Sequence, residues 1–219
     1  FITTSIFTKK PNLIEVHRFF RERYFKKNDL FYKIFYEQLL KVSSKSKLQK
    51  FFDEEKKDFI KIKKLYSFYS ISDIKFRAVR DRYLSPLQYD KIMKSLFKLK
   101  RFDYKKKIKE LYFDKNDLLK ISNNGHYVGL HSHTHPNNIA SLSYSRQLKE
   151  FLLNKKIIEK ITKKKVLCAS FPRGDYNLNT LKIFNNLGLK VAFRDNPYDK
   201  ILNKKLGNLE ISRKNHHQV

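Results

Sequence analysis

The chain has 219 residues, of which 41% are hydrophobic and 15% are aromatic. This apolar content is enough for one sizeable hydrophobic core, or for one domain and part of a second, and it excludes a disordered tail. Lys or Asp interrupts every apolar run before it reaches the ~18 to 20 residues of a membrane-spanning helix, so we expect none. The single cysteine, Cys168, cannot form an internal disulfide bond.

The formal net charge of +28 would by itself suggest nucleic-acid binding. The excess is spread evenly, however, because residues 1–120 carry 32 Lys or Arg against 15 acidic residues and residues 121–219 carry 17 against 6. A dedicated phosphate-binding surface usually concentrates its charge on one element. We therefore interpret the charge as a compositional bias of the source genome and expect no specific nucleic-acid partner.

The first part of the chain is predicted to be one strand followed by helices. Residues 1–7 have the composition of a strand already inside a domain, with no basic leader or signal-peptide cleavage site before it, so we expect the chain to be truncated at its start. Apolar residues recur at helical spacing over residues 11–41 and again over 48–65. Ser85 and Gln88 form the capping box of a further helix.

From Asp114 onwards, strands and helices are predicted to alternate. The expected strands are residues 127–131, 166–171 and 189–194. Helices that begin at Ser143 and Asn177 separate them. Such alternation indicates a parallel sheet or a barrel, in which ligands bind at the carboxyl ends of the strands.

Three of the seven histidines lie at one such strand end, in the run His131-Ser132-His133-Thr134-His135. Neutral imidazoles brought together can share one divalent metal ion. In an extended strand His131 and His135 would be ~13 Å apart, too far for two ~2.1 Å bonds to one ion. Either His131 and His133 bind from one face of a strand, or the chain turns and brings His135 back beside His131.

We favour the turned pair, because Pro136 and the two asparagines after it favour a bend. The hydroxyl groups of Ser132 and Thr134 can stabilise such a bend through bonds to nearby backbone. A loop with ordinary hydrogen bonds and no ligand is the alternative. A catalytic zinc site usually has three protein ligands and an open position for water, so we expect a carboxylate ligand elsewhere.

Four short motifs follow one another between residues 126 and 194. They are Gly-Leu-His-Ser-His-Thr-His-Pro-Asn (129–137), Leu-Ser (142–143), Phe-Pro-Arg-Gly-Asp-Tyr-Asn (171–177) and Leu-Gly-Leu-Lys-Val-Ala-Phe (187–193). The series resembles the later half of polysaccharide deacetylases, the fourth carbohydrate esterase family, also called NodB-like. Residues 1–5 resemble that family's second barrel strand, and the helical stretch to residue 120 resembles an insertion that some members carry.

The resemblance implies an α/β fold, a distorted (β/α)7 barrel of the glycoside hydrolase/deacetylase type, missing its first strand or strands and carrying a large helical insertion. The implied domains are a barrel strand (1–10), the helical insertion (11–113) and the remainder of the deacetylase barrel (114–219). The implied activity is metal-dependent hydrolysis of N-acetyl or O-acetyl groups on a polysaccharide, by a hydrolase of non-peptide carbon–nitrogen bonds. The implied cofactor is a divalent metal ion, with Zn as the first expectation. The implied partner is a glycan with acetylated amino sugars.

The resemblance also implies roles for single residues. His131 and His135 match the family's two metal-binding histidines, and His133 falls on a variable position. The backbone N–H of Arg173 matches the group that helps to hold the tetrahedral oxyanion, a role that does not depend on the side chain. The Arg173 guanidinium either meets an anionic sugar or is solvated. His216 is a candidate for the catalytic acid, with a frayed, exposed tail as the alternative.

Three positions depart from the family's pattern. The Asp-Asp motif, which provides the general base and the third metal ligand, would precede Phe1, and no Asp-Asp pair occurs in the 219 residues. Ser170 stands where an arginine often precedes the proline of the third motif, and the late Leu-x-x-His element has no clean match. We therefore expect this chain by itself to bind metal poorly and to be inactive.

Two other functions stay open. One is a basic helical nucleic-acid-binding module, with aromatic residues interleaved among lysines from Phe19 to Tyr112, although their helical core spacing favours packing over base stacking. The other is a non-catalytic glycan-binding or envelope-assembly protein on the same barrel. Oligomeric state, and location in the cell envelope or the cytoplasm, are not determined by the sequence.

Overall fold

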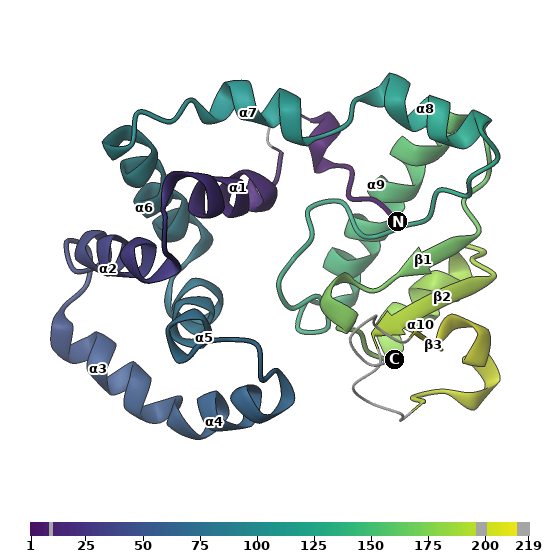
Figure 1. The fold of residues 1–219 in the computed structure, drawn as a ribbon. Helices are drawn as coiled ribbons and strands as arrows, with labels where there is room; N and C mark the ends of the chain where they lie inside the picture. Colours follow the sequence, from purple (N-terminus) through teal and green to yellow (C-terminus); the bar gives the residue numbers. More distant parts are fainter. Residues whose placement is uncertain (9–10, 196–200, 214–219) are drawn as a thin grey trace. The chain divides into compact units, whose positions relative to one another are not determined.

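The computed structural model describes residues 1–8, 11–195 and 201–213. The chain forms two compact units (Figure 1). The helical unit is Leu13–Leu111, and the α/β unit is Phe1–Asn12 together with Tyr112–Val219. The helical unit covers nearly the same residues as the insertion expected at 11–113. No helix in the described ranges is both long enough and apolar enough to cross a membrane.

The helical unit contains seven α-helices and one π-helical turn within its described residues. They are α1 (Ile14–Tyr24), α2 (Asn28–Leu39), α3 (Lys45–Glu54), α4 (Lys56–Leu65), α5 (Ile71–Ala78), the turn Val79–Tyr83, α6 (Pro86–Leu99) and α7 (Tyr104–Leu111). The predicted capping box at Ser85 is confirmed, since Ser85 Oγ accepts from the Gln88 backbone and the Gln88 side chain accepts from the Ser85 backbone. The segment at 11–41 is two helices, because Phe25 adopts an extended conformation between them.

Aromatic side chains build the core of the helical unit. Phe20, Phe35 and Phe97 are fully or almost fully buried. The ring centroids of Phe20 and Phe97 are 4.8 Å apart, and those of Phe35 and Phe76 are 5.0 Å apart, both in edge-on arrangements. Edge-to-face packing of this kind adds to the stability gained by burial. These rings contact one another in the interior of the unit.

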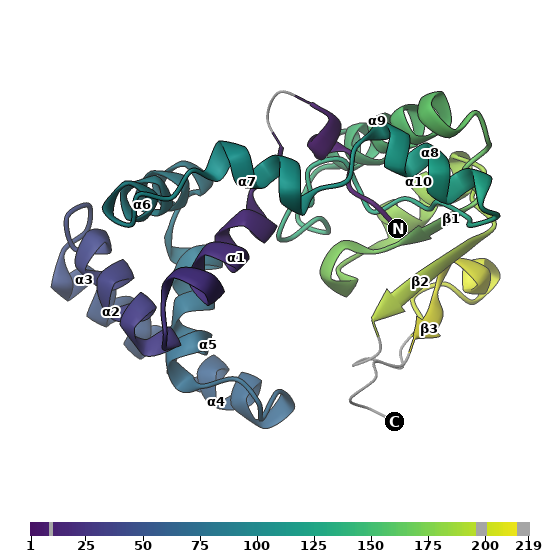
Figure 2. The ribbon, with the colours of Figure 1, turned by 45° about the horizontal axis from the view of Figure 1, so that its top comes forward.

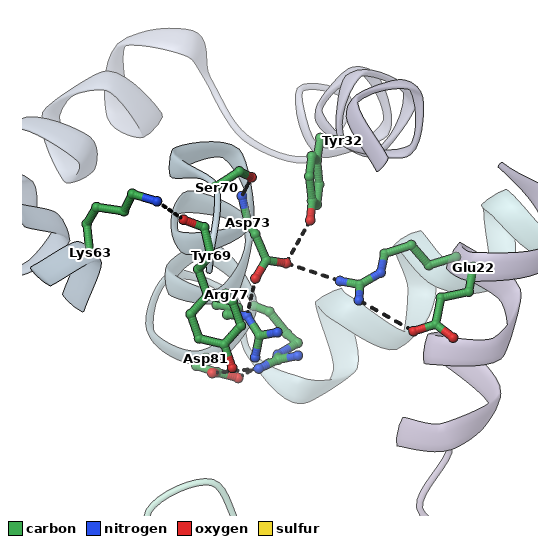
Figure 3. A network of polar contacts seen from close by, with 10 residues as sticks. Glu22, Tyr32, Lys63, Tyr69, Ser70, Asp73, Arg77 and Asp81 are labelled. Atoms are coloured by element: carbon green, nitrogen blue, oxygen red, sulfur yellow. Dashed lines mark hydrogen bonds and ion pairs between the residues drawn. The ribbon is translucent and has the colours of Figure 1, made fainter. Parts of the chain in front are cut away.

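A buried carboxylate links three helices of this unit (Figure 3). Asp73 of α5 accepts hydrogen bonds from Tyr32 of α2 (2.7 Å), Arg21 of α1 (3.3 Å) and Arg77 (2.6 Å). Burial by itself would raise the pKa of Asp73, but the hydrogen bonds from Tyr32 and Arg77 and the charges of both arginines outweigh it and hold the pKa below its usual value. Asp73 is therefore ionised and ties α1 and α2 to α5.

Replacing Asp73 by alanine leaves two arginines and a tyrosine without their common acceptor. We expect Asp73→Ala to lower the free energy of unfolding by about 3 kcal/mol. The control is Glu37→Ala, a change at an exposed position in α2 that should cost less than about 0.5 kcal/mol. Urea unfolding followed by circular dichroism measures both. Equal losses in the two variants would contradict a structural role for the network.

His17 of α1 is held between two aromatic rings. Its ring centroid is 5.2 Å from that of Tyr89 and 5.7 Å from that of Phe97. Burial lowers the pKa of His17 to about 4, although the nearby Asp90 acts in the opposite direction. Its Nε2 atom has no hydrogen-bond partner within the described residues. His17 is thus neutral in the folded protein near pH 7.

In the unfolded chain His17 has its ordinary pKa of 6.5 and binds a proton below that pH. In the folded state it binds this proton only at about pH 4. The contribution of neutral His17 to stability is therefore complete above about pH 6.5 and declines as the pH falls towards 4. We expect His17→Phe to have a flatter dependence of the urea midpoint on pH over this range. Unfolding curves at several pH values measure the slope, and identical slopes in both proteins would refute the assignment.

The α/β unit carries the predicted parallel sheet. Its strands are β1 (Cys168–Ser170), β2 (Val191–Asp195) and β3 (Ile211–Arg213), in the order β1-β2-β3, with both pairings parallel. Its helices are α8 (Lys115–Asn123), α9 (Tyr144–Thr162) and α10 (Leu178–Asn186), with 3-10 turns at Ser5–Phe7, Pro172–Gly174 and Lys204–Leu209. The α/β class is confirmed, whereas a closed seven-stranded barrel is not formed by the residues that the structure describes.

Two expected strands are reduced to single bridges. Ile2 pairs with Leu130 and Leu130 pairs with Ala169, both in parallel, beside β1. The strand predicted over residues 1–7 is wrong beyond this bridge, because Ser5–Phe7 is a 3-10 turn in which the Ser5 carbonyl accepts from Thr8. The strand predicted at 127–131 ends at its bridge, since the backbone N–H of His131 donates to the Asn154 side chain instead of to a neighbouring strand.

One face of the sheet packs against helices. Leu130, Ala169 and Ala192 are fully buried there, in a core that includes Phe151 of α9 and Phe184 of α10. Figure 2 shows α9 and α10 close together along this sheet. Because side chains alternate along a strand, the neighbouring residues face the other way.

The opposite face is also apolar but is only partly covered. The Phe1 ring lies 5.6 Å from that of Phe193 and is 47% exposed. Cys168 and Phe193 are half-buried, and Ile211 is 36% exposed. His131 directly follows Leu130, so by the same alternation of side chains it lies on this opposite face.

Candidate metal centre

The carboxyl ends of the parallel segments gather chemically active residues at one edge of the sheet. His131 directly follows the bridge residue Leu130, and the turn Pro172–Gly174 follows β1. Asp195 ends β2 and is in register with Arg213, which ends β3. Parallel strands bring such ends together, so this edge is where a ligand of the α/β unit is expected.

The backbone turn predicted at the histidine cluster is present in the structure. Ser132 and His135 both have left-handed backbone conformations, with φ of 63° and 57°. The Ser132 Oγ atom accepts a hydrogen bond from the His135 backbone N–H at 3.1 Å, as the sequence suggested for a hydroxyl in this loop. The turn places the rings of His131 and His135 5.1 Å apart between centroids. Metal binding by the pair stays a prediction.

The hydrogen bonds of His131 determine which of its ring nitrogens can bind a metal. Its Nδ1 atom lies 2.8 Å from the backbone oxygen of Ser170. Since a carbonyl oxygen can only accept, Nδ1 carries the proton, and the lone pair of the neutral ring is on Nε2. Burial lowers the pKa of His131 to about 4, and the Ser170 carbonyl offsets this only in part. A neutral imidazole whose other nitrogen is held by a carbonyl is the form that ligates zinc.

His133 does not join the pair. Its Nδ1 atom lies 2.9 Å from the Thr4 hydroxyl, so the ring is directed at the N-terminal segment of the α/β unit. Burial lowers its pKa, while the charge of Glu150 raises it. The geometry with His131 and His133 on one face of a strand is therefore not the one that the structure adopts.

Two residues of α9 that the sequence analysis missed hold the histidine segment. Glu150 accepts hydrogen bonds from the backbone N–H groups of His133 and Thr134. Asn154 accepts from the His131 backbone and donates to the carbonyl of Ile2. Asn154 is fully buried, at the apolar spacing of its helix, and a polar residue at a core position was the signal that could have identified it.

The third motif forms a tight turn beside the histidines. Arg173 is exposed and has a left-handed φ of 57°, and Gly174 follows with φ of 69°. A Cβ atom at Gly174 would lie 2.8 Å from the Cβ of Asp195, so this position needs glycine. The Ser170 carbonyl that binds His131 comes from the strand before this turn, which connects the two motifs. The oxyanion role of the Arg173 backbone stays a prediction.

Two expected parts of a complete site are not among these contacts. His216, the candidate acid, lies outside the described residues. Within the described ranges, no group of three or more His, Cys, Asp or Glu side chains is arranged to hold a metal ion. His131 and His135 fit a zinc site as two imidazole ligands, which is fewer than the three protein ligands of a usual catalytic site.

The fold and the site define a parallel α/β protein with a histidine pair at the carboxyl edge of its sheet. The family model for polysaccharide deacetylases matches residues 73–192, more than half of the chain. The chain therefore belongs to the polysaccharide deacetylase family. The match runs from α5 of the helical unit to β2.

Solved structures of deacetylases resemble parts of the chain. They include Streptococcus pyogenes deacetylase PplD in complex with acetate (21% identity, TM-score 0.42, covering 48% of this chain and 45% of that one). A BA3943 mutant, a carbohydrate esterase family 4 pseudoenzyme with restored enzymatic activity, has 26% identity, TM-score 0.34 and coverages of 36% and 28%. A de-N-acetylase from Aggregatibacter actinomycetemcomitans has 16% identity, TM-score 0.39 and coverages of 47% and 48%. The chain spans less than half the length of each, and no curated protein matches it.

Proposed function

We propose that the chain supplies the histidine-bearing part of a metal-dependent polysaccharide deacetylase. The reaction is the hydrolysis of N-acetyl or O-acetyl groups on a glycan, with acetylated amino sugars as the substrate class. The observation that carries the proposal is the turned pair of His131 and His135, 5.1 Å apart at the carboxyl edge of the sheet. The pair occurs in a chain of the deacetylase family, in which this chemistry is expected.

His131 and His135 are the residues that would hold a divalent ion, with zinc as the expected metal. Neutral imidazoles are preferred zinc ligands, and the bond from His131 Nδ1 to the Ser170 carbonyl leaves Nε2 as the coordinating atom. When bound, such an ion polarises the acetyl carbonyl and lowers the pKa of water. At least one further protein ligand is needed for a complete catalytic site.

Other residues would act on the substrate directly. The backbone N–H of Arg173, in the turn after β1, is proposed to stabilise the oxyanion that forms on the acetyl carbonyl oxygen when water adds to the carbonyl carbon. The exposed Arg173 guanidinium contacts an anionic sugar or remains solvated. His216 is the proposed acid that protonates the leaving amine, and its position lies outside the described residues.

We also propose that the sheet is part of a distorted (β/α)7 barrel. Neighbours in the sheet follow the order of the chain, from Ile2 through Leu130 to β1, β2 and β3. Barrels have this sequential order, whereas doubly wound sheets reverse it at a switch point. The partly covered apolar face that includes Phe1 and Phe193 supports the same architecture, since a barrel encloses that face as its interior.

The functional test uses the complete product of the gene. We expect His131→Ala and His135→Ala each to remove most of the bound zinc and most of the acetate release from acetylated amino-sugar oligomers. His133→Ala is the matched control from the same loop, and its effect should be mild because its ring contacts Thr4 and not the pair. Metal analysis of the purified variants and an acetate assay measure the two effects.

Three results would each contradict a part of the proposal. A greater loss of zinc in His133→Ala than in His135→Ala would replace the turned pair by the strand-face pair. Zinc binding without acetate release would favour the non-catalytic glycan-binding protein. Tight, sequence-selective oligonucleotide binding without acetate release would favour the nucleic-acid-binding module.

A further inference from the structure

We propose that Glu150 of α9 is a positioning residue that holds the histidine turn in its metal-binding conformation and thereby sets the metal affinity of the pair. This inference rests on the proposed function, because it assumes that His131 and His135 bind a metal ion. Glu150 is not itself a proposed ligand. It acts on the backbone of the residues between the two histidines.

The carboxylate of Glu150 is bound by the middle of the turn through both of its oxygens. Oε2 accepts from the backbone N–H of His133 at 2.9 Å and from that of Thr134 at 2.8 Å. Oε1 accepts from the Thr134 hydroxyl at 2.8 Å. Hydrogen bonds to an ionised acceptor are stronger than neutral ones. The carboxylate thus fixes two successive residues of the loop to a helix.

The turn needs such support because its backbone is strained. Ser132 and His135 both have positive φ, which costs free energy in residues other than glycine. The bond between the Ser132 hydroxyl and the His135 backbone lies within the loop and does not anchor it to the rest of the protein. Relaxation of either residue to negative φ would carry the His135 ring away from His131.

The helix that carries Glu150 is a rigid support. Phe151, the next residue, is fully buried in the core of the α/β unit. Asn154 lies one helical turn after Glu150, and its side chain accepts from the His131 backbone at 2.9 Å. One helix therefore holds the first histidine through Asn154 and the segment leading to His135 through Glu150. This arrangement reduces the conformational freedom that metal binding would otherwise have to remove.

Glutamine replaces this carboxylate only in part. Its one oxygen can accept from the two backbone N–H groups and its NH2 group can donate to the Thr134 hydroxyl, but the charge is lost and each bond becomes a weaker, neutral one. The same substitution at Glu159 provides a matched control on the same helix. Glu159 also accepts from a backbone N–H, that of Val166, and from Lys155, but it does not contact the histidine turn.

The experiment compares Glu150→Gln with Glu159→Gln in the complete gene product. Zinc affinity is measured by competition with a chromophoric chelator, and amide hydrogen exchange is measured in the metal-free protein. We expect Glu150→Gln to raise the Kd for zinc roughly 10- to 100-fold, the range found for the supporting residues of metal sites. The amides of His133 and Thr134 should exchange faster in this variant. Glu159→Gln should leave both quantities within about twofold of the parent.

Thr134→Val serves as a graded variant, because it removes only the hydroxyl bond and keeps both backbone bonds to Glu150. It should raise the Kd for zinc by less than Glu150→Gln does. If circular dichroism shows that Glu150→Gln does not fold, Thr134→Val decides the question. An unchanged Kd in that variant then overturns the inference.

The outcomes separate this inference from the proposed function. If the parent binds zinc and Glu150→Gln binds it equally well, the positioning role is wrong and the metal site stands. If the parent binds no zinc, the proposed function fails and the effect on affinity fails with it. In that case the exchange rates of the His133 and Thr134 amides still show whether Glu150 holds the turn.

Discussion

The hydrogen bond between His131 Nδ1 and the Ser170 carbonyl is the contact on which the candidate site depends. It joins the end of one extended segment to the end of β1, and these ends are 39 residues apart in the chain. It also determines the tautomer, so that the lone pair of His131 is on Nε2. Without a carbonyl at this place the ring could rotate or exchange its proton between nitrogens, and neither the direction nor the basicity of the ligand would be defined.

The sheet and α9 together make this contact possible. Parallel pairing of Leu130 with Ala169 brings His131 beside Ser170, and Asn154 then replaces the strand partner that the His131 backbone lacks. A polar side chain in the core has to be satisfied, and Asn154 is, through its bonds to His131, Ile2 and Thr4. The site is therefore an extension of the core of the α/β unit and not an independent loop.

The helical unit also combines local patterns that the sequence reveals with distant contacts that it does not. The aromatic residues at helical spacing predicted its helices, and the capping box at Ser85 predicted the start of α6. The carboxylate of Asp73 joins α1, α2 and α5 through residues up to 52 positions away, and no local pattern indicates such a partner. Both the family resemblance and the family model reach beyond what periodicity can show, because they rest on the order of several motifs.

The sequence by itself determined the alternation of helices and parallel strands, the family, and the turn that brings His135 back towards His131. The alternation follows from residue spacing and the turn uses the Ser132 hydroxyl, both of which act within a few residues, whereas the family follows from the order of several motifs. Only the tertiary structure decided that the His133 ring meets Thr4 and that Glu150 holds the turn. It also decided that the segments at 1–7 and 127–131 are single bridges. Hydrogen-bond partners far apart in the chain are selected by the packing of the whole unit, which local sequence does not encode.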